Sequence, residues 1–179
     1  MASLKQTLTW VKNSRGTPAL IRLLPEGSGE TFKKGALLHY DESEDGVVEV
    51  ARAAGVPSAQ TLLGIALQDA TGTAGTDMDV LIPTADDIFV AAKASDQDTG
   101  VAPSIDDIGD GVGLIKLSST GGAGTEYVVD SGNSNWGRIV GIYGPDQEKR
   151  GGINATFSVG DRVLFQFLSS VVNGDGSVA

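Results

Sequence analysis

The chain has 179 residues, enough for one well-packed domain, and its net charge of −10 disfavours a nucleic-acid partner because phosphates would repel it. It contains no cysteine, which excludes disulfides and thiolate metal sites and fits a reducing compartment of origin. Its 25 glycines, with short apolar runs and no sustained helical period, predict an all-β protein.

Predicted strands alternate with glycine-containing turns along the chain. We expect a small β-barrel or a sandwich, with short helical turns and long loops. Residues 58–63 and 86–92 are the two segments that could compete as short helices. In chain order the predicted strands cover 8–11, 19–24, 32–34, 36–40, 47–52, 62–69, 78–83, 87–95, 114–117, 127–129, 139–143 and 162–168.

Two of these strands carry patterns that predict their position. In the strand that follows the turn ATGTAG, Met78, Val80 and Ile82 alternate with acidic residues, which is typical of a strand with one buried face. The last strand is apolar on both faces, which favours a central place in a sheet. Residues 95–113 are polar and predict a long surface loop, and such loops either contact a partner or are disordered.

Charge is unevenly spread and divides the chain into three parts. Residues 1–25 contain four basic residues and no acid, whereas all 23 acidic residues follow. We interpret residues 1–25 as a basic arm, 26–172 as a β-rich domain and 173–179 as a C-terminal tail. The arm could equally be an ordinary first strand with a few exposed bases. We find neither a signal peptide nor a stretch approaching the ~20 apolar residues that span a bilayer, so we expect synthesis in a cytoplasm and no membrane.

Several motifs imitate catalytic or metal sites. Asp130-Ser131-Gly132 has the aspartic-protease form, but its nearest counterpart at residues 98–100 lies too close for two separate lobes, so a turn that closes a strand is favoured. Residues 41–46 imitate the start of a calcium loop, yet Arg52 stands where a bidentate glutamate belongs. His39 is the one histidine and is expected to be partly buried in a strand. We therefore expect no enzyme, no cofactor and no metal site.

The layout of the chain resembles the β-rich decoration proteins, also called head-stabilising or cement proteins, of tailed bacteriophages. The resemblance covers residues 34 to 172 approximately. Its segments are GALLHYD, VVEVARAA, LLGIALQDATGTAGTDMDVLIP, ADDIFVAAKASD, DIGDGVGL, NWGRIVGIYGP and GDRVLFQFLSS. It implies a β-barrel or β-tulip that binds the outside of a capsid, the major capsid protein as partner and a homo-oligomer, with a trimer favoured. In such proteins an N-terminal arm can become ordered on the shell.

These observations leave two main hypotheses. The first is a structural virion protein on the outer capsid surface, which stabilises the shell and whose basic arm makes the contact. Its expected contact residues are Lys5, Trp10, Lys12, Arg15 and Arg22. The second is a ligand- or glycan-binding β-module of a virion fibre or adhesin, in which acidic loops and Trp136 form a sugar platform. A hydrolase that uses Asp130 is a distant third.

Overall fold

The computed structural model describes residues 8–50, 62–95, 99–116, 127–130, 132, 136–143 and 161–172. Within these residues the protein is all-β, with strands β1 to β11 and one 3-10 turn, Ile105–Asp107. This confirms the predicted fold class. No helix in the described part of the chain is long and apolar enough to cross a membrane.

The first sheet contains six strands and closes on itself. Its order is β1-β7-β11-β10-β8-β9, and a parallel pairing of Lys93 with Val129 and of Ala94 with Asp130 joins β7 to β9. Strands β7, β11, β10, β8 and β9 therefore form a ring, and β1 lies outside it along the first half of β7. The bounds are β1 Thr9–Asn13, β7 Asp87–Ala94, β8 Gly111–Lys116, β9 Tyr127–Asp130, β10 Gly137–Tyr143 and β11 Arg162–Phe167.

The second sheet contains five antiparallel strands in the order β2-β6-β5-β3-β4. Just beyond the end of β2, Glu26 forms a parallel bridge with Val47 of β4, which brings the two terminal strands of this sheet together at one point. The bounds are β2 Leu20–Pro25, β3 Leu37–Asp41, β4 Gly46–Glu49, β5 Gly64–Ala66 and β6 Asp77–Ile82.

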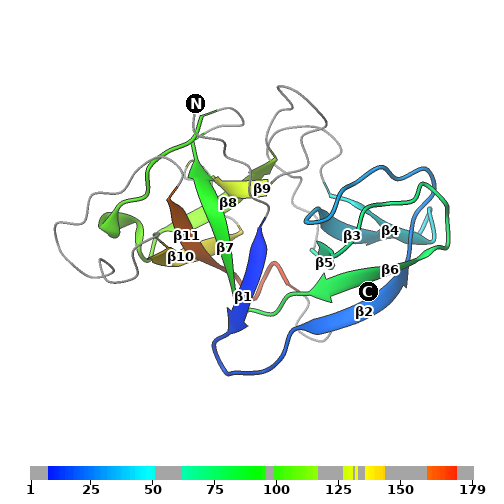
Figure 1. Ribbon diagram of the computed structural model, residues 1–179, viewed down its shortest axis with the longest axis horizontal. Coiled ribbons are helices and arrows are strands. Elements are labelled where there is room, and N and C mark those ends of the chain that lie inside the picture. Colours follow the sequence, from blue (N-terminus) through cyan, green and yellow to red (C-terminus); the bar gives the residue numbers. More distant parts are fainter. Residues whose placement is uncertain are drawn as a thin grey trace.

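The two sheets lie side by side along the longest axis of the molecule (Figure 1). The chain crosses between them from β1 to β2 and returns from β6 to β7, next to Pro83, so the apolar pattern of residues 62–94 is divided between both sheets. Their buried side chains nevertheless form one main cluster, which contains Leu37, Val80, Phe89 and Phe165. The packing of this shared core holds the two sheets together.

The two strand patterns singled out in the sequence are confirmed. Met78, Val80 and Ile82 are buried, while Asp77 and Asp79 are exposed. Strand β11 pairs with β10 on one side and with β7 on the other, so it is central. Its Phe167 ring makes edge-to-face contacts with Phe89 and Phe165, at centroid distances of 5.3 and 4.9 Å, within the range that favours aromatic pairs.

Two local expectations are wrong. Residues 32–34 do not form a strand, because the chain turns at Lys34 and Gly35, where Gly35 has a φ of +91°. Residues 86–92 belong to a turn and β7 and are not helical, since β7 is paired on both edges. The other helical candidate, 58–63, lies largely outside the described residues. Strands β3 and β4 form a hairpin, and Asp45 in its turn has a φ of +49°.

Candidate attachment surfaces

The described members of the expected contact set are divided between the two sheets. Lys5 lies outside the described residues. Trp10 and Lys12 lie on β1 and Arg15 on the turn that follows it, whereas Arg22 lies on β2 in the other sheet. The described part of the predicted arm thus contributes one strand to each sheet, with β1 against β7 and β2 against β6.

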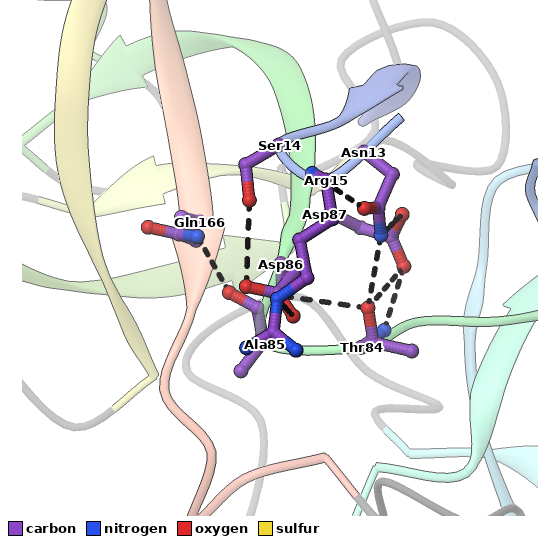
Figure 2. Close-up of polar contacts among 8 residues, drawn as sticks. All are labelled: Asn13, Ser14, Arg15, Thr84, Ala85, Asp86, Asp87 and Gln166. Carbon is purple, nitrogen blue, oxygen red and sulfur yellow. Dashed lines mark hydrogen bonds and ion pairs between the residues drawn. The ribbon is translucent and has the colours of Figure 1, made fainter. Parts of the chain in front are cut away.

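Trp10 is held by its own chain through Asp87. The indole Nε1 donates to Asp87 Oδ1 at 2.9 Å, and Asn13 Nδ2 donates to the same oxygen at 3.0 Å. The backbone N and the hydroxyl of Thr84 both donate to Asp87 Oδ2 at 2.8 Å. Asp87 is 2% exposed, so this buried carboxylate is stabilised by four donors that fix β1 to the β6–β7 connection. Figure 2 shows the side chains of Asn13 and Thr84 around Asp87.

At the same junction Arg15 makes an exposed ion pair with Asp86. Its Nε lies 2.9 Å from Asp86 Oδ2, and the side chains are 77% and 33% exposed. Ser14 N donates to the carbonyl of Asp86 at 2.7 Å, which pins the start of the β1–β2 connection. Figure 2 shows Ser14 and Arg15 over the segment that carries Asp86. An exposed ion pair of this kind contributes little to stability, so the Arg15 charge stays accessible to a partner.

A β-bulge turns the next apolar residue outward. The pairing of β1 with β7 shifts register between Trp10 and Lys12, which leaves Val11 as the extra residue. Val11 is 39% exposed and Lys12 is also exposed. Bulges near sheet edges commonly re-aim a side chain in this way. Val11, Lys12 and Arg15 form what we call the strand patch.

Strand β2 carries the two most exposed large apolar side chains in the described part of the chain, Ile21 and Leu23. Leu20, Ile21 and Leu23 are 41%, 52% and 64% exposed. The exposed Arg22 lies between them, opposite Val80 of β6. β2 is a terminal strand of its sheet, so its outer backbone groups border this apolar stretch. We call Leu20, Ile21, Arg22 and Leu23 the β2 edge.

The sequence predicted β2 but not its exposure. Its apolar residues fall on both faces, as in β11, and that pattern favours a central strand. The structure places β11 centrally and β2 at the end of its sheet. The mismatch between an apolar pattern and an edge position is the signal for an attachment surface, and it is visible only once the sheet order is known.

The described part of the predicted polar loop is attached to the closed ring of β7, β11, β10, β8 and β9, which we call the barrel. Lys93 Nζ lies 2.7 Å from Asp107 Oδ1, and their side chains are 8% and 14% exposed. Ser104 and Asp107 cap the 3-10 turn reciprocally, and Gly109 N donates to the carbonyl of Ile139 at 2.8 Å. Ile105 and Ile108 remain 41% and 44% exposed, beside the exposed Asp106 and Asp110. These last four residues form what we call the loop patch.

Buried charges between the sheets are satisfied internally. Lys116 Nζ lies 2.6 Å from Glu49 Oε1, and Tyr127 OH donates to the same oxygen at 3.1 Å. Glu26 is fully buried and accepts from Thr71 N and Gly72 N at 2.9 and 2.6 Å. No group of three metal-ligating side chains occurs among the described residues. These carboxylates fix loops and join strands.

The catalytic look-alikes take ordinary structural positions. Asp130 is 5% exposed and its Oδ1 accepts from Gly132 N at 2.8 Å, which confirms a turn that closes β9. Asp41 Oδ1 accepts from the N and Oγ of Ser43 at 2.9 and 2.6 Å, so the loop that imitates a calcium site is closed on itself. His39 is half-buried in β3, as expected.

Trp136 is 4% exposed and belongs to the main core. A sugar platform needs an aromatic face open to solvent, and Trp136 does not offer one. The glycan-binding alternative therefore lacks the aromatic side chain on which it relied.

Comparison with known proteins leaves the family open. No protein-family model matches the chain, and no curated protein or solved structure matches it either. The resemblance to phage decoration proteins thus rests on the layout of the sequence alone.

Proposed function

We propose that this chain is a structural virion protein that binds the outer surface of a bacteriophage capsid and stabilises the shell. The observation that carries the proposal is the β2 edge, where Leu20, Ile21 and Leu23 are 41%, 52% and 64% exposed on a terminal strand. An edge strand of this kind is an aggregation hazard for a free protein unless a partner covers it. The major capsid protein is the partner proposed for it.

The scaffold suits a structural task. Both sheets share one apolar core, and buried ion pairs connect strands and loops, so the edge is presented on a rigid body. A rigid edge loses little conformational entropy on binding. A partner strand that adds to β2 would gain backbone hydrogen bonds, while pockets for Ile21 and Leu23 would fix the register.

Repetition increases the effect of each contact. A capsid presents many identical sites, so a modest affinity per site is sufficient when several linked copies bind together. The acidic body, with a net charge of −10, disfavours non-specific aggregation of the free protein. These properties favour a structural rather than a catalytic role.

The direct test adds purified protein to undecorated, expanded shells of the phage that encodes it. The proposal predicts binding at a fixed ratio per capsomer and a higher temperature of shell disruption. If shells incubated with excess protein carry none of it on their surface, the proposal is contradicted. A glycan array provides the counter-test, because selective binding there with no shell binding would favour the alternative module.

A further inference from the structure

The exposed large apolar side chains of the described residues gather in three places. One is the β2 edge. The other two are the strand patch, where Val11 lies beside two exposed bases, and the loop patch, where Ile105 and Ile108 lie beside two exposed acids. The strand patch is therefore apolar and basic, and the loop patch is apolar and acidic. Their chemistry is complementary.

Within one copy the two patches lie apart. The strand patch borders residues 87–90 in the first half of β7. The loop patch is hydrogen-bonded to β10 through Gly109 and through Ile139 N, which donates to the carbonyl of Asp110 at 3.1 Å, and Asp107 within the same loop is paired with Lys93 near the other end of β7. In the barrel ring β7 and β10 are separated by β11 on one side and by β9 and β8 on the other. Figure 1 shows the 3-10 turn at one end of the long axis and β1 near the middle. One copy cannot bring these patches together.

We propose that the strand patch of one copy binds the loop patch of a second copy, head to tail. Val11 would contact Ile105 and Ile108, while Lys12 and Arg15 would face Asp106 and Asp110. Apolar burial supplies the attraction, and the opposite charges fix the orientation and exclude like-with-like pairing. Because the two surfaces differ, the contact is heterologous and generates either a ring or an open chain.

The loop patch is prepared for binding before the partner arrives. The Lys93–Asp107 pair and the reciprocal cap of Ser104 hold the 3-10 turn on the barrel. Binding a preordered loop costs less entropy than ordering a flexible one. The strand patch is also held in place, since Trp10 and Asn13, which flank Val11 and Lys12, are hydrogen-bonded to Asp87.

This contact goes beyond shell binding and assigns Lys12 and Arg15 to the neighbouring copy, while Arg22 stays with the β2 edge. The experiment is sedimentation equilibrium of the purified full chain over a concentration series. The wild type should self-associate, and more weakly at high salt because screening removes the charge attraction. A wild type that stays monomeric at every concentration overturns the proposal.

Two variants make the test specific. The strand variant carries Val11→Ser and Lys12→Glu, and the loop variant carries Ile105→Ser and Ile108→Ser. The self-association of each variant alone should be weaker than that of the wild type by at least about tenfold. Mixed together, they should form one-to-one heterodimers through the single intact pair of patches. Recovery in the mixture also shows that both variants are folded.

Charge reversal on both sides provides a second arm. A chain that carries both Lys12→Glu and Asp106→Lys should regain the self-association that either substitution alone removes. Lys34→Glu, the same charge change on an exposed lysine near the second sheet, should leave association unchanged. Variants that associate as the wild type does, or a mixture that stays monomeric, contradict the head-to-tail contact.

The two proposals fail separately. A chain that decorates shells but never self-associates overturns this contact and leaves the proposed function intact. A chain that self-associates through these patches but does not bind shells overturns the proposed function and leaves this contact intact.

Discussion

The Nζ of Lys116 lies 2.6 Å from the Oε1 of Glu49, and this ion pair joins β8 in the first sheet to β4 in the second. The side chains are 5% and 7% exposed, so water screens the pair weakly. The Tyr127 hydroxyl on β9 donates to the same carboxylate oxygen. This buried polar contact crosses between the two sheets and specifies how β8 and β4 face each other.

Removing one partner of this pair should be costly. Lys116→Met leaves the Glu49 carboxylate buried without its counter-charge, and the free energy of unfolding in urea should fall by about 3–5 kcal/mol. Lys116→Met combined with Glu49→Leu removes both charges and should recover much of that loss. A double variant as unstable as the sum of the single variants would contradict the coupling.

Asp87 provides a second test of stability, at the junction between the sheets. Asp87→Ala leaves the donors of Trp10, Asn13 and Thr84 without their acceptor, so unfolding free energy should fall by about 2–3 kcal/mol. The neighbouring Asp86→Ala is the matched control. It breaks the exposed pair with Arg15 and should cost less than about 1 kcal/mol. Equal losses at the two positions would show that the Asp87 cluster does not fix β1.

Gly64 tests the close approach of β5 to β6. A Cβ at this position would overlap the side chain of Val80 and approach the carbonyl oxygen of Leu81. Gly64→Ala should therefore lower the free energy of unfolding by about 1–3 kcal/mol. At Gly141 a Cβ would instead meet the end of the Leu164 side chain at 3.2 Å, which can move. Gly141→Ala should cost clearly less, and the reverse order would contradict the strand spacing.

The hairpin between β3 and β4 contains a carboxylate, Asp41, whose contribution to the stability of the fold depends on pH. Hydrogen bonds from the Ser43 hydroxyl and backbone N hold the pKa of Asp41 below its ordinary value. Because the folded pKa is the lower one, the ionised carboxylate stabilises the fold above the unfolded pKa, and this contribution is lost as the pH falls through the folded pKa. Ser43→Ala should raise the pKa of Asp41 in a carboxyl-carbon NMR titration. An unchanged Asp41 titration would contradict the hydrogen bond.

The strands could be predicted because their signal is local. Alternation at Met78, Val80 and Ile82 needs only neighbouring residues, and so does the positive φ at Asp45. The division of these strands between two sheets could not be predicted, since contacts such as Trp10 with Asp87 join residues 77 positions apart. The same limit applies to buried charges, because Glu49 and Lys116 look like surface residues until their strands meet.

The candidate site shows the same division. Basic residues at the start of the chain are visible in the sequence, but whether Trp10 faces a partner or its own chain depends on where β1 pairs. Trp10 is engaged by Asp87, and exposure is concentrated at Leu20, Ile21 and Leu23. The proposed attachment surface therefore depends on sheet order, and composition alone does not show it.

We propose that the β2 edge holds the protein on a shell. A binding isotherm of edge variants on undecorated shells tests this proposal most directly. Ile21→Thr and Leu23→Thr keep β propensity while they remove apolar surface. Together they should weaken shell binding by about tenfold or more while urea unfolding changes little. Lys34→Thr, at an exposed position outside the edge and outside the strand and loop patches, is the control and should retain at least most of the binding. Wild-type affinity in the double edge variant would contradict the account.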